Sequence, residues 1–343
     1  MLYIFVLESE SSNQQTNQST HQYIMEVTVH QLPEDVLLEI FSFLDAISLC
    51  KVRRVCQLWN RLSTDDILWK HKLLADVHNW KQVSNSSLPD SYIQDAEISK
   101  FDVYMRSSPE IQKWKKSVYQ QTTIHQLSDM LRMFMPMKRY TFGVGASAMD
   151  SYGKGQSFFS KLLSFDAGNV FQHCGQFPGK FRGFGGGFQF KYKRCMLELC
   201  LMYVAPKSLR DAMTVEQQIE MLESKMTDGS YLQLLQTLHG YIHSIDTRIL
   251  DGNSEQQTLT NLKKQAKEVE LLNKHLKADT PLLILSSRKV ESDPFISSYQ
   301  VCQCLNLNSL SRPWMVSECS AQMIYRDIVD PVDWLISAVN TSS

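Results

Sequence analysis

The sequence predicts an N-terminal module of short helices followed by a C-terminal α/β domain. Apolar residues recur at helical spacing between residues 30 and 74. From residue 138 onward, short apolar runs alternate with amphipathic segments, a pattern typical of α/β domains. The chain has 343 residues, 43% of them hydrophobic. That length is sufficient for about two domains with a sizeable core.

Composition argues against several classes of function. The 35 Lys and Arg residues balance 36 Asp and Glu residues, which gives no electrostatic reason to expect nucleic acid or an anionic membrane as partner. No apolar run reaches the ~20 residues that a membrane span needs. The apolar residues 1–7 lack the basic region and cleavage site of a signal peptide, so we do not expect secretion. Eight cysteines without a Cys-x-x-Cys pair favour a reducing compartment. We expect the cytoplasm, with the nucleus as an alternative.

Four segments follow from the local composition. Residues 1–27 are mostly polar after the first few positions, and we expect a disordered tail there. Residues 28–76 form the helical module, and residues 77–137 are predicted to be a helical linker with a turn-rich stretch near its start. Residues 138–343 form the α/β domain.

The helical module carries more apolar surface than its own core can use. Pro33 and the acidic residues after it predict a helix start near Leu32. Apolar residues then cover roughly 220° of that helix, about twice the arc that one small core needs. Asp45 can cap a second helix that extends to Trp59, and a third follows from Thr64. A unit of about 45 residues is marginal alone. We therefore expect a permanent partner, the alternative being that these helices pack on the α/β domain.

The residues of this module resemble an F-box. The resemblance rests on the run Leu32–Leu44, on Leu49-Cys50, on Val55-Cys56 with Trp59-Asn60, and on the closing Ile67-Leu68-Trp69. It implies a three-helix F-box that binds the Skp adaptor and, through it, a cullin-RING (SCF) ubiquitin ligase. By position, the implied contact residues are Leu32, Pro33, Ile40, Leu44, Leu49, Val55 and Trp59. Large apolar anchors of this kind dominate protein interfaces.

The α/β domain has the outline of a small-GTPase-like fold. We predict strands at 139–145, 188–193, 195–205, 238–246, 281–286 and 314–316, and helices around Phe158 and at 210–226, 254–277, 294–306 and 324–339. This order resembles the six-stranded, mostly parallel sheet of small GTPases. In that fold the second strand would be antiparallel and would lie at the sheet edge.

The nucleotide-binding motifs of a GTPase are incomplete. A phosphate loop needs a glycine five positions before Gly153-Lys154 and a Ser or Thr after it, but Ala148 and Gly155 stand there. The run Ser286–Lys289 replaces the Asn-Lys-x-Asp that reads guanine. We therefore expect no cofactor and no catalysis. A GTP-binding switch protein with an appended F-box is the alternative.

With an F-box followed by a GTPase-like domain, the chain resembles one family of F-box proteins. In that family, an atypical GTPase-like domain docks substrates for ubiquitination and degradation. The resemblance implies a substrate adaptor, with telomere-repeat-binding protein or D-type cyclins as targets. Strand addition at the sheet edge is predicted to involve Gly186, Gly187, Phe188, Gln189, Phe190 and Lys191. Alternatively, Lys191 and Lys193 only protect that edge from aggregation. A homodimer is left open.

Two patterns suggest metal sites and are set aside. His239 and His243 have the spacing of zinc-binding helices, but their segment reads as a strand and no third ligand is evident. Cys302 and Cys304 point to different faces of a predicted helix, which favours partly buried thiols. We therefore predict no metal.

Overall fold

The computed structural model describes residues 32–85, 99–119, 137–145, 170–179, 185–203, 209, 212–249, 254–288, 294–320 and 324–342. The predicted tail at 1–27, the segment around Gly153-Lys154 and the predicted helix around Phe158 lie outside these residues.

The N-terminal module has four helices rather than three. They are α1 (Glu34–Ser42), α2 (Ala46–Val52), α3 (Gln57–Leu62) and α4 (Asp66–Asp76). Asp45 caps α2, as predicted, by accepting a hydrogen bond from the Ser48 amide at 2.7 Å. The predicted second helix divides because Cys56 is extended and its thiol caps α3, accepting from the Trp59 amide.

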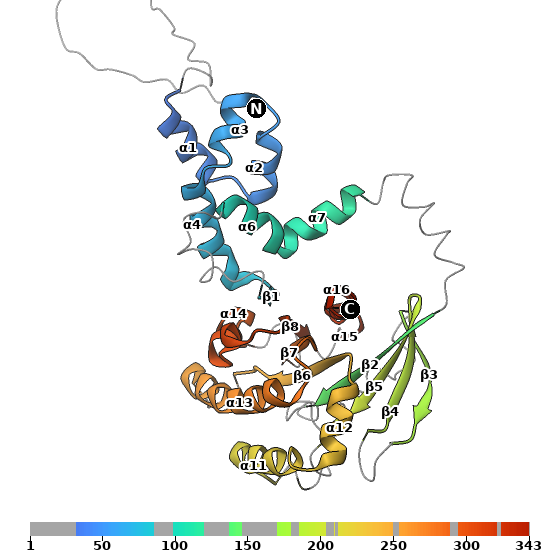
Figure 1. Cartoon of the computed structure of the whole chain (residues 1–343). Helices are drawn as coiled ribbons and strands as arrows, with labels where there is room; N and C mark the ends of the chain where they lie inside the picture. The colour runs from blue at the N-terminus through green and yellow to red at the C-terminus, as the bar shows by residue number, and fades with distance from the viewer. Residues whose placement is uncertain are drawn as a thin grey trace, which may run out of the picture.

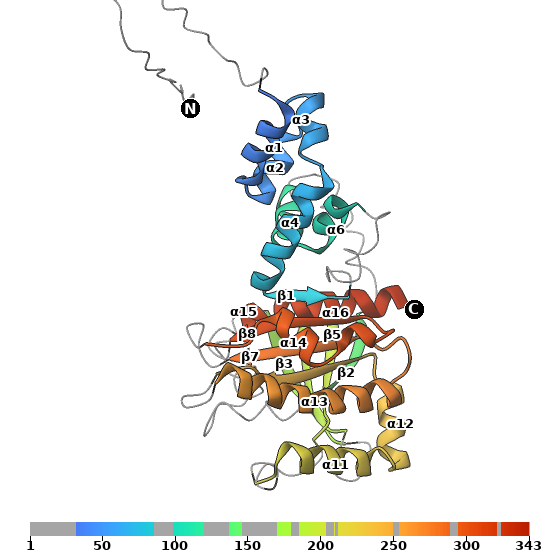
Figure 2. The same cartoon turned by 90° about the vertical axis from the view of Figure 1, so that its left-hand side faces the viewer.

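The linker contains a β-strand as well as helices. After α4 come a 3₁₀ turn η2 (Val77–Asn79), strand β1 (Gln82–Ser84), and helices α6 (Lys100–Ser107) and α7 (Pro109–Tyr119). The predicted helical linker thus also contains a strand. Figure 2 shows α4 descending from the module to β1, which lies along the sheet of the α/β domain. A strand of three residues has too short a pattern for sequence periodicity to detect.

The α/β domain is built on one eight-stranded sheet in the order β1-β8-β7-β6-β2-β5-β4-β3. Its strands are β2 (Lys138–Gly145), β3 (Phe171–Phe177), β4 (Gly187–Tyr192), β5 (Cys195–Leu201), β6 (Gly240–Asp246), β7 (Leu282–Arg288) and β8 (Trp314–Ser320). The strands from β8 to β5 are parallel to one another, whereas β4, β3 and β1 are antiparallel to their neighbours. The sheet is therefore mostly parallel, but the predicted count of six strands is wrong.

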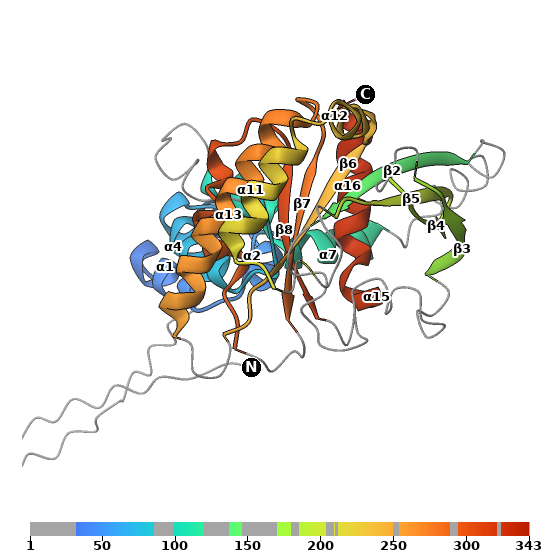
Figure 3. The same cartoon turned by 90° about the horizontal axis from the view of Figure 1, so that it is seen from below.

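Helices cover the two faces of the sheet unequally. On one face lie α12 (Gly229–Thr237), α13 (Glu255–His275) and α14 (Ser298–Cys304), and α11 (Val215–Lys225) packs on the outer side of α13 (Figure 2). On the other lie α15 (Ile324–Asp327) and α16 (Val329–Ser342), which pack on apolar residues of β2, β4 and β5. Figures 1 and 3 show β3, β4 and β5 extending to one side as a wing. No helix among the described residues is long and apolar enough to cross a membrane.

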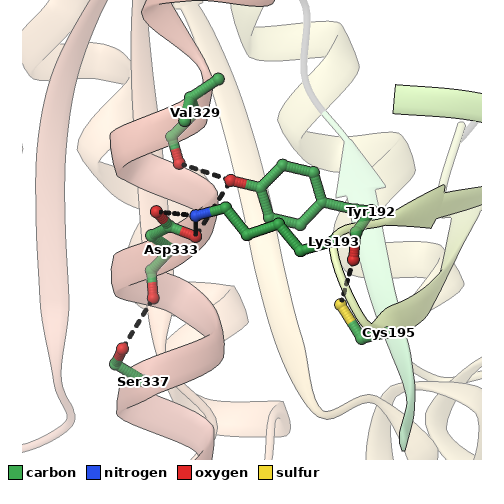
Figure 4. Close-up of polar contacts among 6 residues, drawn as sticks. All are labelled: Tyr192, Lys193, Cys195, Val329, Asp333 and Ser337. Carbon is green, nitrogen blue, oxygen red and sulfur yellow. Dashed lines mark hydrogen bonds and ion pairs between the residues drawn. The ribbon is translucent and has the colours of Figure 1, made fainter. Parts of the chain in front are cut away.

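The β4–β5 hairpin is fixed to α16 by polar contacts (Figure 4). The Tyr192 hydroxyl donates to an Asp333 carboxylate oxygen at 2.9 Å, and the Lys193 ammonium forms an ion pair with the same carboxylate. Burial and the nearby negative charge of Asp333 raise the pKa of Tyr192, which keeps it a hydrogen-bond donor at neutral pH. These contacts fix the wing relative to the last helix.

Candidate functional site

Helix α1 turns apolar side chains both inward and outward. Leu37 and Phe41 are buried in the module, whereas Val36, Ile40 and Phe43 are 43%, 44% and 80% exposed. The outward residues are spaced four and three apart, so they share one face of the helix. A phenylalanine exposed to this degree on a small module indicates a surface that a partner covers.

Three further apolar side chains of the module are also exposed. Val55 lies between α2 and α3, Ile67 lies in the first turn of α4, and Leu74 lies two turns further along. We refer to these residues together as the exposed apolar set: Val36, Ile40, Phe43, Val55, Ile67 and Leu74. Only Ile40 and Val55 were among the predicted contacts. The signal for Val36 and Phe43 was the wide apolar arc of the first helix.

The other predicted contact residues have different environments. Pro33 is exposed, and Leu32, Leu44 and Trp59 are half-buried. The Trp59 ring packs edge-on against Phe41, with centroids 5.5 Å apart. Leu49 is fully buried in the core, so its predicted role as a contact residue does not agree with the structure. The Leu49 side chain packs in the hydrophobic core of the module.

Polar contacts between helices hold this surface in shape. Arg61 on α3 forms an ion pair with Glu34 at the start of α1, and the Lys72 ammonium on α4 donates to the Ser42 carbonyl at 3.3 Å. The buried indole N–H of Trp69 donates to the Ser63 carbonyl at 2.6 Å. These contacts connect α3 and α4 to the two ends of α1, and α4 to the end of α3.

The predicted docking strand is not at the edge of the sheet. β4 pairs with β5 on one side and with β3 on the other, so both rows of its backbone groups are used. The assignment of Gly186 to Lys191 to a free edge is therefore wrong. Among the described strands, β3 has a neighbour on one side only and forms that edge. Sequence reading missed β3 because most of its side chains are polar and exposed, with a bulge before Gly175.

The side chain of Tyr241 fills the space at the end of β2 where a phosphate loop would begin. A β-carbon on Gly143 would lie 2.8 Å from the Tyr241 ring, and one on Gly145 would collide with the Tyr241 hydroxyl. The two glycines are thus needed for packing against Tyr241. Burial raises the pKa of Tyr241 well above its ordinary value, so the phenol stays neutral.

The described residues of the segment that would read guanine, Ser286, Ser287 and Arg288, are buried and bonded within the domain. The hydroxyls of Ser286 and Thr247 are 2.9 Å apart, and the Ser287 hydroxyl donates to the Ile245 carbonyl at 2.7 Å. The Arg288 guanidinium lies 3.6 Å from the Glu318 carboxylate and stacks over Phe295 at 4.1 Å from its centroid. These side chains therefore serve the fold.

Two buried titratable groups face each other beneath α13. The Nε2 atom of His243 on β6 is 3.5 Å from a carboxylate oxygen of Glu268. Burial lowers the pKa of His243 to about 4 and raises that of Glu268 to about 7, so both groups favour their neutral forms. Tyr231 and Tyr241 also lie near Glu268.

Neither the histidine pair, His239 and His243, nor the cysteine pair, Cys302 and Cys304, forms a metal site in the described part of the chain. His239 lies just before β6 and His243 is the fourth residue of that strand, so about 13 Å of largely extended chain separates them, too far to share an ion. The Nδ1 atom of His239 accepts a hydrogen bond from the Thr141 amide. Cys302 and Cys304 are buried. No group of three or more His, Cys, Asp or Glu among the described residues could hold a metal.

Comparison with known proteins places these features in context. Residues 29–75 match the family model described as F-box-like. The chain is 23% identical to F-box only protein 4 of Homo sapiens over 338 residues, 92% of this chain and 84% of that protein. Identity to F-box only protein 4 of Bos taurus is also 23%, over 91% of this chain and 84% of that protein. F-box/LRR-repeat protein 12 of Homo sapiens is 48% identical over 44 residues, 13% of this chain and 14% of that protein.

Proposed function

We propose that this chain is the substrate-recognition subunit of an SCF ubiquitin ligase, with its helical module docked on the Skp adaptor. The observation that carries the proposal is the exposed apolar set, which lies on a module matching the F-box-like model. Similarity to F-box only protein 4 over most of the chain supports the same role. Burying apolar anchors such as Phe43 in a partner removes them from water, which stabilises the complex.

We further propose that the α/β domain is small-GTPase-like and captures a protein rather than a nucleotide. The six strands predicted from sequence occur in one sheet in the order β8-β7-β6-β2-β5-β4, and β4 is the outermost and antiparallel of these six. The position of Tyr241 against Gly145 and the burial of Arg288 support the absence of a nucleotide site. The alternative, a GTP-binding switch, predicts micromolar binding of labelled GTP with magnesium that Lys154→Ala abolishes.

In this proposal the chain performs no chemistry. It holds a substrate near the ubiquitin-charged enzyme that the cullin recruits, which raises the effective concentration of the substrate lysine. The exposed edge of β3 supports capture by strand addition, because its outward backbone groups have no strand partner among the described residues. Telomere-repeat-binding protein and D-type cyclins are the candidate targets, leading to their degradation in the cytoplasm or the nucleus.

Measuring the affinity of the purified chain for the Skp adaptor by calorimetry tests the first proposal. We expect Ile40→Asp and Phe43→Asp each to weaken binding at least about 30-fold, because a charge would be buried among apolar anchors. Val170→Asp is the matched control, an apolar-to-acidic change at a residue 40% exposed outside the module. If the wild-type chain does not bind the adaptor, or if all three variants bind equally well, the proposal is wrong.

A further inference from the structure

Strand β1 is formed by the linker, yet it completes the sheet of the α/β domain. Val83 pairs with Val316 on β8, in antiparallel register. The ladder extends beyond the strand at both ends, because the Glu318 amide donates to the Lys81 carbonyl at 2.9 Å and the Asn85 amide donates to the Trp314 carbonyl at 3.2 Å. The linker therefore runs alongside β8 from Trp314 to Glu318 as an additional strand of the sheet.

Side chains on both sides of β1 secure this pairing. Val83 is completely buried. The His78 ring packs edge-on against Tyr299 on α14, with centroids 4.7 Å apart. The hydroxyl of Ser298 donates to the Lys81 carbonyl at 3.2 Å, so that carbonyl accepts from both α14 and β8. Backbone, aromatic and apolar contacts thus hold the same short segment.

The segment before β1 joins it to the module without a loop. Helix α4 passes directly into η2, and only Trp80 and Lys81 separate η2 from β1. Helix α6 supports this junction. The Tyr104 hydroxyl donates to the Asp76 carboxylate at 2.5 Å, and the Tyr104 ring packs edge-on against the Trp80 ring, with centroids 5.7 Å apart. One continuous buried cluster extends from Leu37 in α1 to Trp314 in β8.

We propose that α4, η2 and β1 form a rigid strut that fixes the orientation of the exposed apolar set relative to the edge of β3. Its functional meaning rests on the proposed function: the strut would hold a captured substrate at a constant position relative to the adaptor. The strut also occupies the edge of β8, so that the two edges of the described sheet are the three-residue strand β1 and the longer strand β3. Figure 1 shows the module and β3 at different ends of the molecule.

Electron-spin resonance distance measurement between two labels tests the strut. One label uses Cys174 on β3, the one exposed cysteine of the chain, and the other uses Glu39→Cys on the exposed side of α1. Cys50→Ala and Cys56→Ser remove the two half-buried thiols, and the serine hydroxyl oxygen replaces the Cys56 sulfur as the cap of α3. The full chain is expected to give one narrow distance distribution, and a broad one would overturn the proposal.

The decisive variant is Val83→Pro, with Gln82→Pro as its matched control. Lys81 is hydrogen-bonded to β8, and such positions alternate along an antiparallel ladder, so the Val83 N–H faces β8 and the Gln82 N–H faces away. We expect Val83→Pro to broaden the distribution at least twofold and Gln82→Pro to leave it narrow. A narrow distribution in Val83→Pro would overturn the proposal.

Hydrogen exchange of the wild-type chain gives a second test that needs no variant to fold. The amides of Asn85 and Glu318 are expected to exchange within tenfold of the amides of β7, and exchange as fast as in an exposed loop would overturn the strut. Adaptor affinity of Val83→Pro separates the two proposals. If the adaptor binds the wild type and Val83→Pro equally while the distance distribution of Val83→Pro broadens, both proposals stand. If the adaptor binds neither protein, the proposed function is wrong, and the distance distributions alone decide whether the strut is rigid.

Discussion

The hydroxyl of Tyr241 on β6 lies directly over Gly145 at the end of β2, in the space that any larger residue at position 145 would need. The ring itself passes over Gly143, two residues earlier on the same face of β2. The Gly-Val-Gly sequence therefore ends a strand packed against a tyrosine. This packing accounts for both glycines without a phosphate loop.

Gly145→Ala is expected to lower the free energy of unfolding by about 1–3 kcal/mol, because Tyr241 must move in a close-packed core. Tyr241→Phe removes the colliding oxygen, so the double variant should recover most of the loss that Gly145→Ala causes. Urea unfolding of the four species measures this coupling. Gly229→Ala is the control, since a β-carbon there meets no atom within 4 Å. Equal stability of Gly145→Ala and wild type would contradict the packing.

The buried pair of His243 and Glu268 predicts a stability plateau on the acid side of neutrality. The pKa of His243 is lowered from 6.5 to about 4, so its burial costs stability as pH falls below 6.5. The pKa of Glu268 is raised from 4.5 to about 7, so its burial costs stability as pH rises above 4.5. Between these limits the pair binds one proton whether folded or unfolded, and its net contribution does not change with pH.

Single variants of the pair should reveal opposite slopes. Glu268→Gln leaves His243 alone, so stability relative to wild type should fall as pH decreases from 6.5 to 4.5, by up to about 1.4 kcal/mol per pH unit. His243→Gln leaves Glu268 alone, and stability relative to wild type should fall as pH increases over the same range. Denaturant unfolding at several pH values measures both. Parallel curves for the two variants would disprove the coupling.

Leu49 and Ile40 should respond differently to truncation. Leu49 is fully buried, so Leu49→Ala is expected to reduce stability by about 2–5 kcal/mol through the cavity it leaves. Ile40 is 44% exposed, so Ile40→Ala should change stability by less than about 1 kcal/mol while weakening adaptor binding. Thermal unfolding and calorimetric binding of the same samples make the comparison. Loss of affinity without loss of stability in Leu49→Ala would show that the core assignment is wrong.

Substrate capture at β3 predicts sensitivity to proline at one particular position. The Gly186 carbonyl accepts from the Leu201 amide on the β5 side, so Gly187 turns its backbone toward β3, where it pairs with Phe177. Gln176, the residue before Phe177 on β3, therefore directs its N–H away from β4. Gln176→Pro should reduce binding of purified telomere-repeat-binding protein at least tenfold and leave the fold intact.

The contrasting variant for that experiment is Phe177→Pro, which removes an N–H directed toward β4 and should lower the melting temperature. Surface plasmon resonance with immobilised target protein measures the affinities. Binding of Gln176→Pro with wild-type affinity, where the wild-type chain does bind, would exclude strand addition at this edge.

Local chemistry explains which elements could be predicted from sequence. Asp45 was recognised as a helix cap because capping needs only a short polar side chain before an apolar period. The strands β6 and β7 were recognised because each is buried on both faces, and β5 because it is apolar at every position but Glu198. The break between α2 and α3 was missed because the thiol of Cys56 is an unusual cap.

The helical module with its surplus of apolar residues, the alternation of the α/β domain and the incomplete nucleotide motifs are all readable in the sequence, because each depends on neighbouring residues and fixed periods. Other features come from the three-dimensional packing: Leu49 is in the core while Phe43 is exposed, β3 pairs with β4, Tyr241 lies against Gly145, and β1 pairs with β8. These features depend on pairing between residues far apart in the chain. Short or polar strands carry no local signal for such pairing, since their partners supply the hydrogen bonds and the burial that hold them.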